Sequence, residues 1–249
     1  MKREVILPAF PMRIISLVPS QTELLYYLGL EKEVVGITKF CIHPDEWYRI
    51  KDRVGGTKSL DIEKIRQLKP DLIIGSKEEN EQSDIKALME IAPVWMSDIF
   101  NLDDAIQMIH SVGQISNKAV ESNELVKRIQ EQFELLNSLK EDKTVLYFIW
   151  QEPMMLAGKN TFIDSMLQQC GLTNLAGNER YPEATGKENP DFIFLSSEPF
   201  PFGEKHISEF QQLYPKSKVV LVDGEFFSWY GSKLKDAPNY FNQILTQLY

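Results

Sequence analysis

Cysteine and histidine are the scarcest reactive side chains of this 249-residue chain, and one of each lie close together. The sequence contains 2 cysteines and 3 histidines, and the stretch GITKFCIHPDEW (36–47) places Cys41 two residues before His43. Thiolate and imidazole are ligands that zinc favours, and together they also form the pair of a nucleophilic enzyme. A reactive cysteine needs a helix N-terminus or a positively charged partner to lower its pKa, so closeness to His43 in the sequence does not by itself make the two a dyad.

The rest of the sequence does not complete either kind of site. CxxC, HExxH and GxSxG, which mark zinc sites and nucleophiles, are all absent. Glu78 and Glu79, in the acidic run SKEENEQSD, could join Cys41 and His43 around an ion once the chain is folded. This set defines an alternative function, an intracellular metal-binding enzyme or sensor.

A glycine pair gives a second motif that could do chemistry. RVGGTKS (53–59) has the composition of a phosphate-binding loop, but it lacks the spacing GxxxxGK[ST]. Gly55 and Gly56 therefore predict a tight turn, which would let a ligand approach Thr57 and Lys58 closely.

Composition excludes several classes of partner. The formal net charge is −9, and 43% of the residues are hydrophobic, so the chain has no basic face for nucleic acid or an anionic membrane. Cys41 and Cys170 leave one disulfide open as a possibility. The N-terminal stretch shows no signal peptide, which favours a cytoplasmic protein or a chain whose leader has been removed. No apolar run approaches the roughly 20 residues of a membrane span.

Apolar periodicity predicts an α/β organisation that occurs twice. Strands are predicted at 13–19, 33–38, 71–76 and 93–98, and again at 144–150, 190–197 and 218–223, with helices between them. Ser20 is predicted to cap the first helix. LKPDLIIGSKEEN (68–80) matches ENPDFIFLSSEPF (188–200) in order and type of residue, which indicates a repeated unit.

Between the two halves, apolar residues recur at helical spacing over 102–139 without a proline. This pattern predicts one long helix, or two in line, approaching about 50 Å in length. We therefore expect two Rossmann-like lobes with parallel-type sheets, 1–101 and 141–249, joined by a backbone helix at 102–140. The expected ligand cleft lies between the lobes, where the carboxyl ends of the strands carry the loops.

Aromatic residues gather in the loops that follow the predicted strands. They include Phe40 and Trp47 after the second strand, Trp150 at the end of the fifth, and Phe200, Phe202, Phe226, Phe227, Trp229 and Tyr230 after the last two. Single loop aromatics usually pack into small satellite clusters. Their recurrence at the carboxyl ends of strands favours a site that grips a large, partly flat ligand by stacking.

The ordered segments RIISLVPSQTELLYYLGL, RVGGTKSLDIEKIRQLKPDLIIGSKEEN, GKNTFIDSMLQQCGLTNL and NPDFIFLSSEPFPF resemble those of class III substrate-binding proteins of ABC importers. Within that class they are most similar to the helical-backbone metal receptors, which bind cobalamin, ferric siderophores or haem. The resemblance covers essentially the whole chain. It implies a non-catalytic, monomeric receptor for a metal chelate, with no cofactor of its own, at the cell surface or in the periplasm.

The resemblance also implies site residues. The ligand-binding residues would be Ser20, Phe40, His43, Trp47, Thr57, Lys58, Glu78, Glu79, Trp150, Glu198, Phe200, Phe226, Phe227, Trp229 and Tyr230. His43 would be a polar contact or an axial metal ligand, or else a rim residue that caps the turn before Pro44. Lys58 lies near an aromatic position of cobalamin-binding members and would suit an anionic chelate. Glu63 and Glu183, with Glu188 as another candidate, would dock onto permease arginines.

Overall fold

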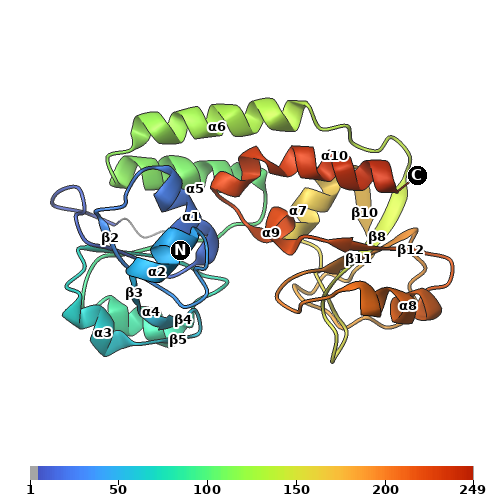
Figure 1. The fold of residues 1–249 in the computed structure, drawn as a ribbon, viewed down its shortest axis with the longest axis horizontal. Coiled ribbons are helices and arrows are strands. Elements are labelled where there is room, and N and C mark those ends of the chain that lie inside the picture. Colours follow the sequence, from blue (N-terminus) through green and yellow to red (C-terminus); the bar gives the residue numbers. More distant parts are fainter. Residues whose placement is uncertain (1–4, 249) are drawn as a thin grey trace. The chain divides into compact units, whose positions relative to one another are not determined.

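The computed structural model describes residues 5–248, which form two compact units (Figure 1). The first unit comprises residues 5–99, 103–127 and 230–233, and the second comprises 100–102, 128–229 and 234–248. Both units are built on a parallel sheet with helices on its faces, so the predicted α/β class is confirmed. The predicted lobe boundaries stay a prediction.

The first unit carries a five-stranded sheet in the order β3-β2-β1-β6-β7, in which every neighbouring pair is parallel. Its elements are β1 (Ile14–Ser16), α1 (Pro19–Tyr27), β2 (Val34–Ile37), α2 (Asp45–Ile50), β3 (Asp52–Arg53), β4 (Gly55–Gly56), β5 (Ser59–Leu60), α3 (Ile62–Gln67), β6 (Leu72–Ser76), α4 (Gln82–Leu88), β7 (Val94–Ser97) and α5 (Leu102–Ile115). β4 and β5 form a hairpin that turns at Thr57 and Lys58, just after the glycine pair where the tight turn was predicted. Gly55, in β4, has a φ of 97°, a conformation that favours glycine.

Both faces of this sheet are covered by helices. Ile15, Ile73 and Val94 pack with Ile65 of α3 and Leu88 of α4 on one face. α1 and α5 lie on the other (Figure 1). A strand buried on both sides reads as a continuous apolar run instead of an alternating one, which explains the sequences of β1 and β6.

The second unit carries the parallel order β10-β8-β11-β12, with β9 added antiparallel to β8. Its elements are β8 (Lys143–Trp150), β9 (Met155–Leu156), α7 (Phe162–Gln169), β10 (Leu172–Asn174), β11 (Phe192–Ser196), α8 (Glu204–Leu213), β12 (Lys218–Val222), α9 (Gly224–Ser228), the 3-10 helix η1 (Ser232–Lys235, whose first two residues belong to the first unit) and α10 (Ala237–Gln247).

Alternate residues of β8 face opposite layers. Tyr147 packs against Phe227 of α9, with ring centroids 5.3 Å apart, whereas Phe148 packs against Phe210 of α8 at 4.8 Å. Phe227 in turn lies 4.7 Å from Phe241 of α10. α8 therefore covers one face of this sheet, and α9 and α10 cover the other (Figure 1).

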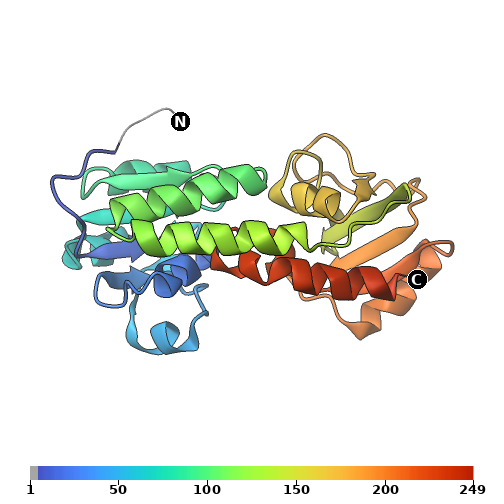
Figure 2. The ribbon, with the colours of Figure 1, turned by 90° about the horizontal axis from the view of Figure 1, so that it is seen from above.

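The helical segment after β7 differs from its prediction. It forms two helices, α5 and α6 (Ala119–Glu134), and not one. Asn117 adopts a φ of 58°, and Lys118 N donates to Gly113 O at 2.7 Å, a 6→1 hydrogen bond that ends α5 and turns the chain. The start of α6 then lies beside α5, because a Cβ on Gly113 would come 2.0 Å from Ser122 Oγ (Figure 2). The in-line form is wrong because the asparagine ends the first helix without a proline.

Two short helices replace predicted loops. α9 is capped by Asp223, whose Oδ1 accepts from Glu225 N at 3.1 Å, and α2 carries the exposed i,i+4 pair Asp45–Arg49 at 2.7 Å. Short helices of this kind have too few turns to show periodicity. The predicted cap at Ser20 is also wrong, because Pro19 starts α1 one residue earlier and Ser20 lies within the helix.

Two remaining features of the fold concern the cysteines and the apolarity of the helices. Cys41 and Cys170 are both buried and free, so the disulfide left open by the sequence does not form. Within residues 5–248 no helix combines the length and apolarity that crossing a membrane requires.

Candidate functional site

The topology of each sheet singles out one place at its carboxyl edge. In the first unit the chain passes from β1 to β2 on one side, while β6 pairs on the other side of β1. In the second unit β8 lies in the same way between β10 and β11. Loops that diverge from two such adjacent strands leave a crevice, where ligands bind in open α/β sheets. Of the predicted ligand-binding residues, those at or after these central strands are Ser20, Glu78, Glu79, Trp150, Glu198 and Phe200, and the others follow β2 and β12 or lie in the β4–β5 hairpin.

In the first unit, Asn80 ties the loop after β6 to the β4–β5 turn. Its Oδ1 accepts from Ser76 N at 2.9 Å, and its Nδ2 donates to Thr57 O at 3.0 Å. A Cβ at Gly75 would lie 2.7 Å from Asn80 Oδ1, so the close approach of the amide requires glycine there. Thr57, Glu78 and Glu79 are all predicted to contact ligand. Asn80 thus holds Thr57 close to the loop that carries the two glutamates, at one edge of the sheet.

Tyr230 reaches the same edge from the far end of the sequence. Its hydroxyl donates to Glu79 Oε1 at 3.5 Å, across 151 residues of chain. The side chain is buried, and burial raises the pKa of Tyr230, with the charge of Glu79 acting in the same direction. Ser76 and Ser97 act on the pKa of Tyr230 in the opposite direction. Tyr230 is therefore neutral and held by a polar set that belongs wholly to the first unit.

Cys41 is a structural thiol, buried in the core of the first unit. Thr22 Oγ1 and Thr38 Oγ1 each lie 3.1 Å from Cys41 Sγ. Burial raises the pKa of the Cys41 thiol, so it stays protonated and is a poor nucleophile or metal ligand. His43 is exposed. Among residues 5–248 no three or more His, Cys, Asp or Glu side chains are grouped to hold a metal ion, so the alternative metal-binding function has no support.

The two aromatic residues predicted near Cys41 differ in exposure. Phe40 is 51% exposed, and Lys39 Nζ lies 5.1 Å from its ring centroid. Trp47 is 0% exposed and packs edge-on against Tyr26, with centroids 5.3 Å apart. Because α2 turns Trp47 into the core, its ring has no exposed face for the predicted stacking. Lys58 is exposed at the hairpin tip, and Ser20 is buried in α1.

In the second unit, Trp150 and Phe200 lie together where β8 and β11 end. Their ring centroids are 5.6 Å apart, and Phe200 N donates to Ile149 O at 3.2 Å. Trp150 Nε1 donates to Glu152 O at 3.0 Å, while the side chain stays 40% exposed. Phe200 also contacts Phe202, at a centroid distance of 4.7 Å, which continues toward α8. This edge offers an open aromatic surface.

The remaining aromatic residues of the second unit follow β12. Phe226 stacks on Tyr240 at 4.3 Å and 14°, and Phe227 is fully buried against β8 and β11. Phe227 is thus a core residue, because α9 directs it into the sheet, and it has no exposed face for ligand. Trp229 is only 7% exposed, and it donates from Nε1 to Glu198 Oε1 at 3.0 Å.

Glu198 is a half-buried carboxylate at this edge. Besides the indole it accepts from Ser228 Oγ at 2.6 Å. Burial raises the pKa of Glu198, and the charges of Glu225 and Asp223 act in the same direction, while the two hydrogen bonds oppose them. The family resemblance implied that Glu198 contacts ligand. No pattern in the sequence predicted its hydrogen bond to Trp229, 31 residues later.

The predicted docking glutamates lie at the surface of separate units. Glu63 is exposed in the first turn of α3, and Glu183 is exposed in a bridge to Met155.

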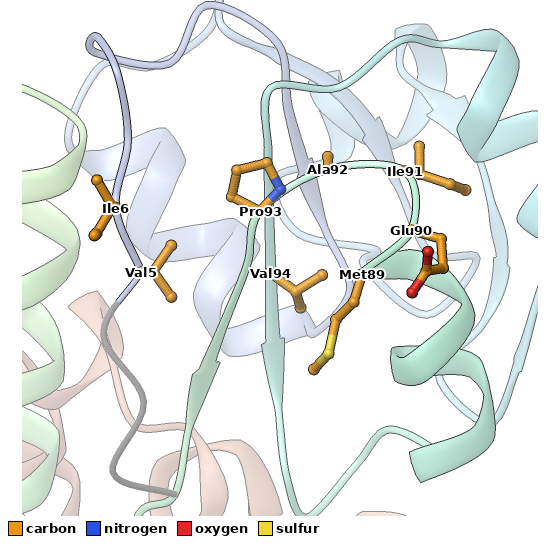
Figure 3. Close-up of a pocket in the computed structure, with 8 residues that line it drawn as sticks. All are labelled: Val5, Ile6, Met89, Glu90, Ile91, Ala92, Pro93 and Val94. Carbon is orange, nitrogen blue, oxygen red and sulfur yellow. The ribbon is translucent and has the colours of Figure 1, made fainter.

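A hollow lined by Val5, Ile6 and residues 89–94 opens near the amino end of β7 (Figure 3). It is at the opposite edge of the first sheet from the ligand loops, so the rule for α/β sheets does not favour it.

Comparison with known families decides the class of protein. The model of the periplasmic binding protein family matches residues 14–213. The chain belongs to the periplasmic binding protein family. This confirms the resemblance read from the sequence segments.

Two curated relatives of this periplasmic binding protein cover most of the chain. The ABC transporter substrate-binding lipoprotein YvrC of Bacillus subtilis is 30% identical over 200 residues, which span 74% of this chain and 63% of that protein. A vitamin B12-binding protein of Pectobacterium carotovorum is 23% identical over 252 residues, which span 96% of this chain and 89% of that protein.

Solved structures show that this periplasmic binding protein shares their fold. The vitamin B12-binding protein of Vibrio cholerae superposes with a TM-score of 0.82 at 21% identity, covering 97% of this chain and 99% of that one. The haem-binding protein BhuT, solved with two haems, gives 0.80 at 20% identity over 95% and 98%. The siderophore-binding protein BauB, solved with ferric acinetobactin, gives 0.80 at 18% over 97% and 95%.

Proposed function

We propose that this periplasmic binding protein is the substrate-binding component of an ABC importer and that its substrate is a metal chelate of the cobalamin, haem or ferric siderophore class. The protein binds and does not catalyse. It acts outside the cytoplasmic membrane as a monomer, and it delivers its ligand to a permease. The ligand cleft predicted between the lobes stays a prediction.

One observation carries the choice of ligand. Trp150 and Phe200, from different strands, form an aromatic pair at the carboxyl edge of β8 and β11, and Trp150 remains open to solvent. Large flat or partly apolar ligands bind aromatic faces of this kind with few polar contacts. The relatives and structural neighbours bind ligands of this chemistry, which supports the same class here.

The first unit carries exposed polar side chains at its own sheet edge. Phe40 is exposed beside Lys39, and Lys58 is exposed at the hairpin tip. These two ammonium groups suit propionate, phosphate or other acidic groups on the rim of a chelate. His43, also exposed, has an imidazole that could ligate the metal of a bound chelate.

Titration of the purified protein tests the ligand class. Cyanocobalamin, haemin and a ferric hydroxamate are added separately while tryptophan fluorescence is recorded, since all three absorb where indole emits. We expect one of them to bind far more tightly than millimolar, which corresponds to about −4 kcal/mol. Binding no tighter than millimolar for every chelate would contradict the proposal. Trp150→Phe tests whether the ring of Trp150 takes part in binding. Trp95→Phe, in β7 of the first unit, is its matched control.

Permease docking is tested apart from ligand binding. Glu63→Arg and Glu183→Arg are expected to reduce capture by the cognate permease in detergent or nanodiscs while leaving chelate affinity unchanged, because both carboxylates are exposed and outside the sheet edges. Glu209→Arg, an exposed acidic position on α8, is the control. Unaltered capture by both docking variants would overturn these assignments.

A further inference from the structure

The carboxylate of Glu198 is built into the second unit by three separate features. Oε1 accepts from Ser228 Oγ at 2.6 Å and from Trp229 Nε1 at 3.0 Å, so two donors from the end of α9 converge on one oxygen. The backbone beyond it is also tied down, since Ser196 Oγ donates to Glu198 O at 2.7 Å. A single acceptor thus joins the loop after β11 to the segment after β12.

The stem of Glu198 occupies space that only a glycine leaves open. A Cβ at Gly224 would lie 2.5 Å from Glu198 Cγ and 2.4 Å from Ser196 Oγ. Gly224 is the first residue of α9, and Ser197 Oγ accepts from its N–H at 2.9 Å. The side chain of Glu198 is therefore confined on one side by the start of α9 and bonded on the other by its end.

We propose that Glu198 is a positioning residue that fixes the indole ring of Trp229 at the carboxyl edge of the second sheet through its Oε1. The family resemblance implies that both residues contact ligand separately. The geometry instead indicates that Glu198 supports the ring of Trp229. A charged acceptor gives a stronger hydrogen bond than a neutral one, so the ionised carboxylate holds the ring most firmly.

The groups that face Glu198 make this hold sensitive to pH. Burial raises the pKa of Glu198, and Glu225 and Asp223, both on α9 or at its cap, add repulsion that acts in the same direction. Ser228 and Trp229 face it as neutral donors, and the Tyr147 hydroxyl lies beyond Ser196 at 3.0 Å from its Oγ. Protonation weakens the bond to the indole, and it takes place at a higher pH than for an exposed glutamate.

Fluorescence of the ligand-free protein tests the position of the ring. The emission of Trp229 is isolated by subtracting the spectrum of Trp229→Phe, and it is followed from acidic to neutral pH. We expect a step in emission with a midpoint above that of an ordinary glutamate. Glu198→Gln should abolish the step, and Glu225→Gln should move its midpoint down. Glu209→Gln, on the exposed face of α8, should leave it unchanged.

Two further variants separate the hydrogen bond from the fold. Glu198→Ala should shift the Trp229 emission to the red at neutral pH, because water replaces the acceptor, and Glu198→Gln should restore most of the wild-type emission. If Glu198→Ala does not fold, the pH profile of Glu198→Gln decides the matter. A wild-type step that survives in Glu198→Gln would overturn the proposal.

The link from ring position to affinity rests on the proposed function. With the chelate that the wild type binds among cyanocobalamin, haemin and a ferric hydroxamate, Glu198→Ala should weaken binding roughly tenfold, the loss expected for one charged hydrogen bond. An unchanged Kd in both Glu198→Ala and Trp229→Phe would overturn this link. A wild type that binds no chelate but shows the ligand-free step would contradict the proposed function and support the positioning role.

Discussion

The two units use the same device where their strands begin and different side chains where the strands end. Pro70-Asp71 and Pro190-Asp191 stand at matching places of the repeat. Asp71 accepts from Arg13 N, at the start of β1, and Asp191 accepts from Thr144 N, at the start of β8. Each aspartate thus ties its strand, β6 or β11, to the central strand beside it.

At the carboxyl edges the resemblance ends. The first unit places small polar side chains there, such as Asn80, Ser76 and Thr57, which bond one another and the backbone. The second unit places rings there, with Trp150 and Phe200 in contact. The shared device maintains sheet geometry, whereas the divergent edges are where we propose that ligand is recognised, because loops can change without altering the sheet.

The largest effect is expected where an edge segment doubles as core. Phe227→Ala should cost about 3–5 kcal/mol in the free energy of unfolding, because the ring is fully buried against Tyr147, Phe194 and Phe241. Phe226→Ala, one residue earlier and only half-buried, is the control and should cost clearly less. Urea unfolding followed by circular dichroism measures both. Equal losses would mean that α9 does not separate a core ring from an edge ring.

Much of this fold could be predicted, and the missed parts share a cause. The central strands follow from long apolar runs, and Gly29 and Gly171, which directly follow the caps of α1 and α7, adopt φ values of 73° and 76°. The burial of Trp47 and Phe227 was missed because α2 and α9 span little more than one turn, too short to show a period. Their surroundings, rich in acidic residues and glycine, are typical of loops.

The candidate site was predictable by strand order but not by contact. Trp150 and Phe200 lie at or after the ends of two runs that the sequence marks as strands, and the observed pairing of these strands brings the two rings together. The bonds of Glu198 to Trp229 and of Glu79 to Tyr230 depend on where distant segments return. No local pattern encodes such a return, since it is set by the packing of the whole unit.

The turn between α5 and α6 gives the next largest effect. Gly113→Ala should destabilise the chain by about 1–3 kcal/mol, because the new methyl group would overlap Ser122 and part the helices. Thermal unfolding checks this. Gly203→Ala is the control, since nothing lies within 4 Å of its Cβ position and its φ of −149° suits any residue. A stable Gly113→Ala would show that α6 can move away from α5 without loss.

Ligand affinity sharpens the contrast between the edges. Trp150→Ala should weaken chelate binding by roughly tenfold, because a stacked ring contributes about 1 kcal/mol or more beyond its buried area. Phe40→Ala, at the polar edge, should weaken it less, and Lys58→Ala should matter only for an anionic chelate. Fluorescence or absorbance titration at two ionic strengths measures the three. A larger loss in Phe40→Ala would reverse the assignment of the aromatic role to the second unit.

The smallest effect tests the device that the units share. Asp71→Ala and Asp191→Ala should each cost about 1 kcal/mol, since each removes an acceptor for backbone N–H groups near the surface. The hydrogen bonds from Thr144 lower the pKa of Asp191, with Lys143 acting in the same direction. Between the folded and unfolded pKa values the unfolded chain binds more protons, so stability is lost as pH falls through this window.

Asp191→Asn separates this charge effect from the shape of the side chain. It should remove the contribution of Asp191 to acid destabilisation while keeping one acceptor oxygen near Thr144, so the wild type and the variant should converge at low pH and differ at neutral pH. Urea unfolding at a series of pH values measures the difference. A constant difference at every pH would show that the aspartate holds β11 to β8 through geometry alone, and that its ionisation is not part of the device.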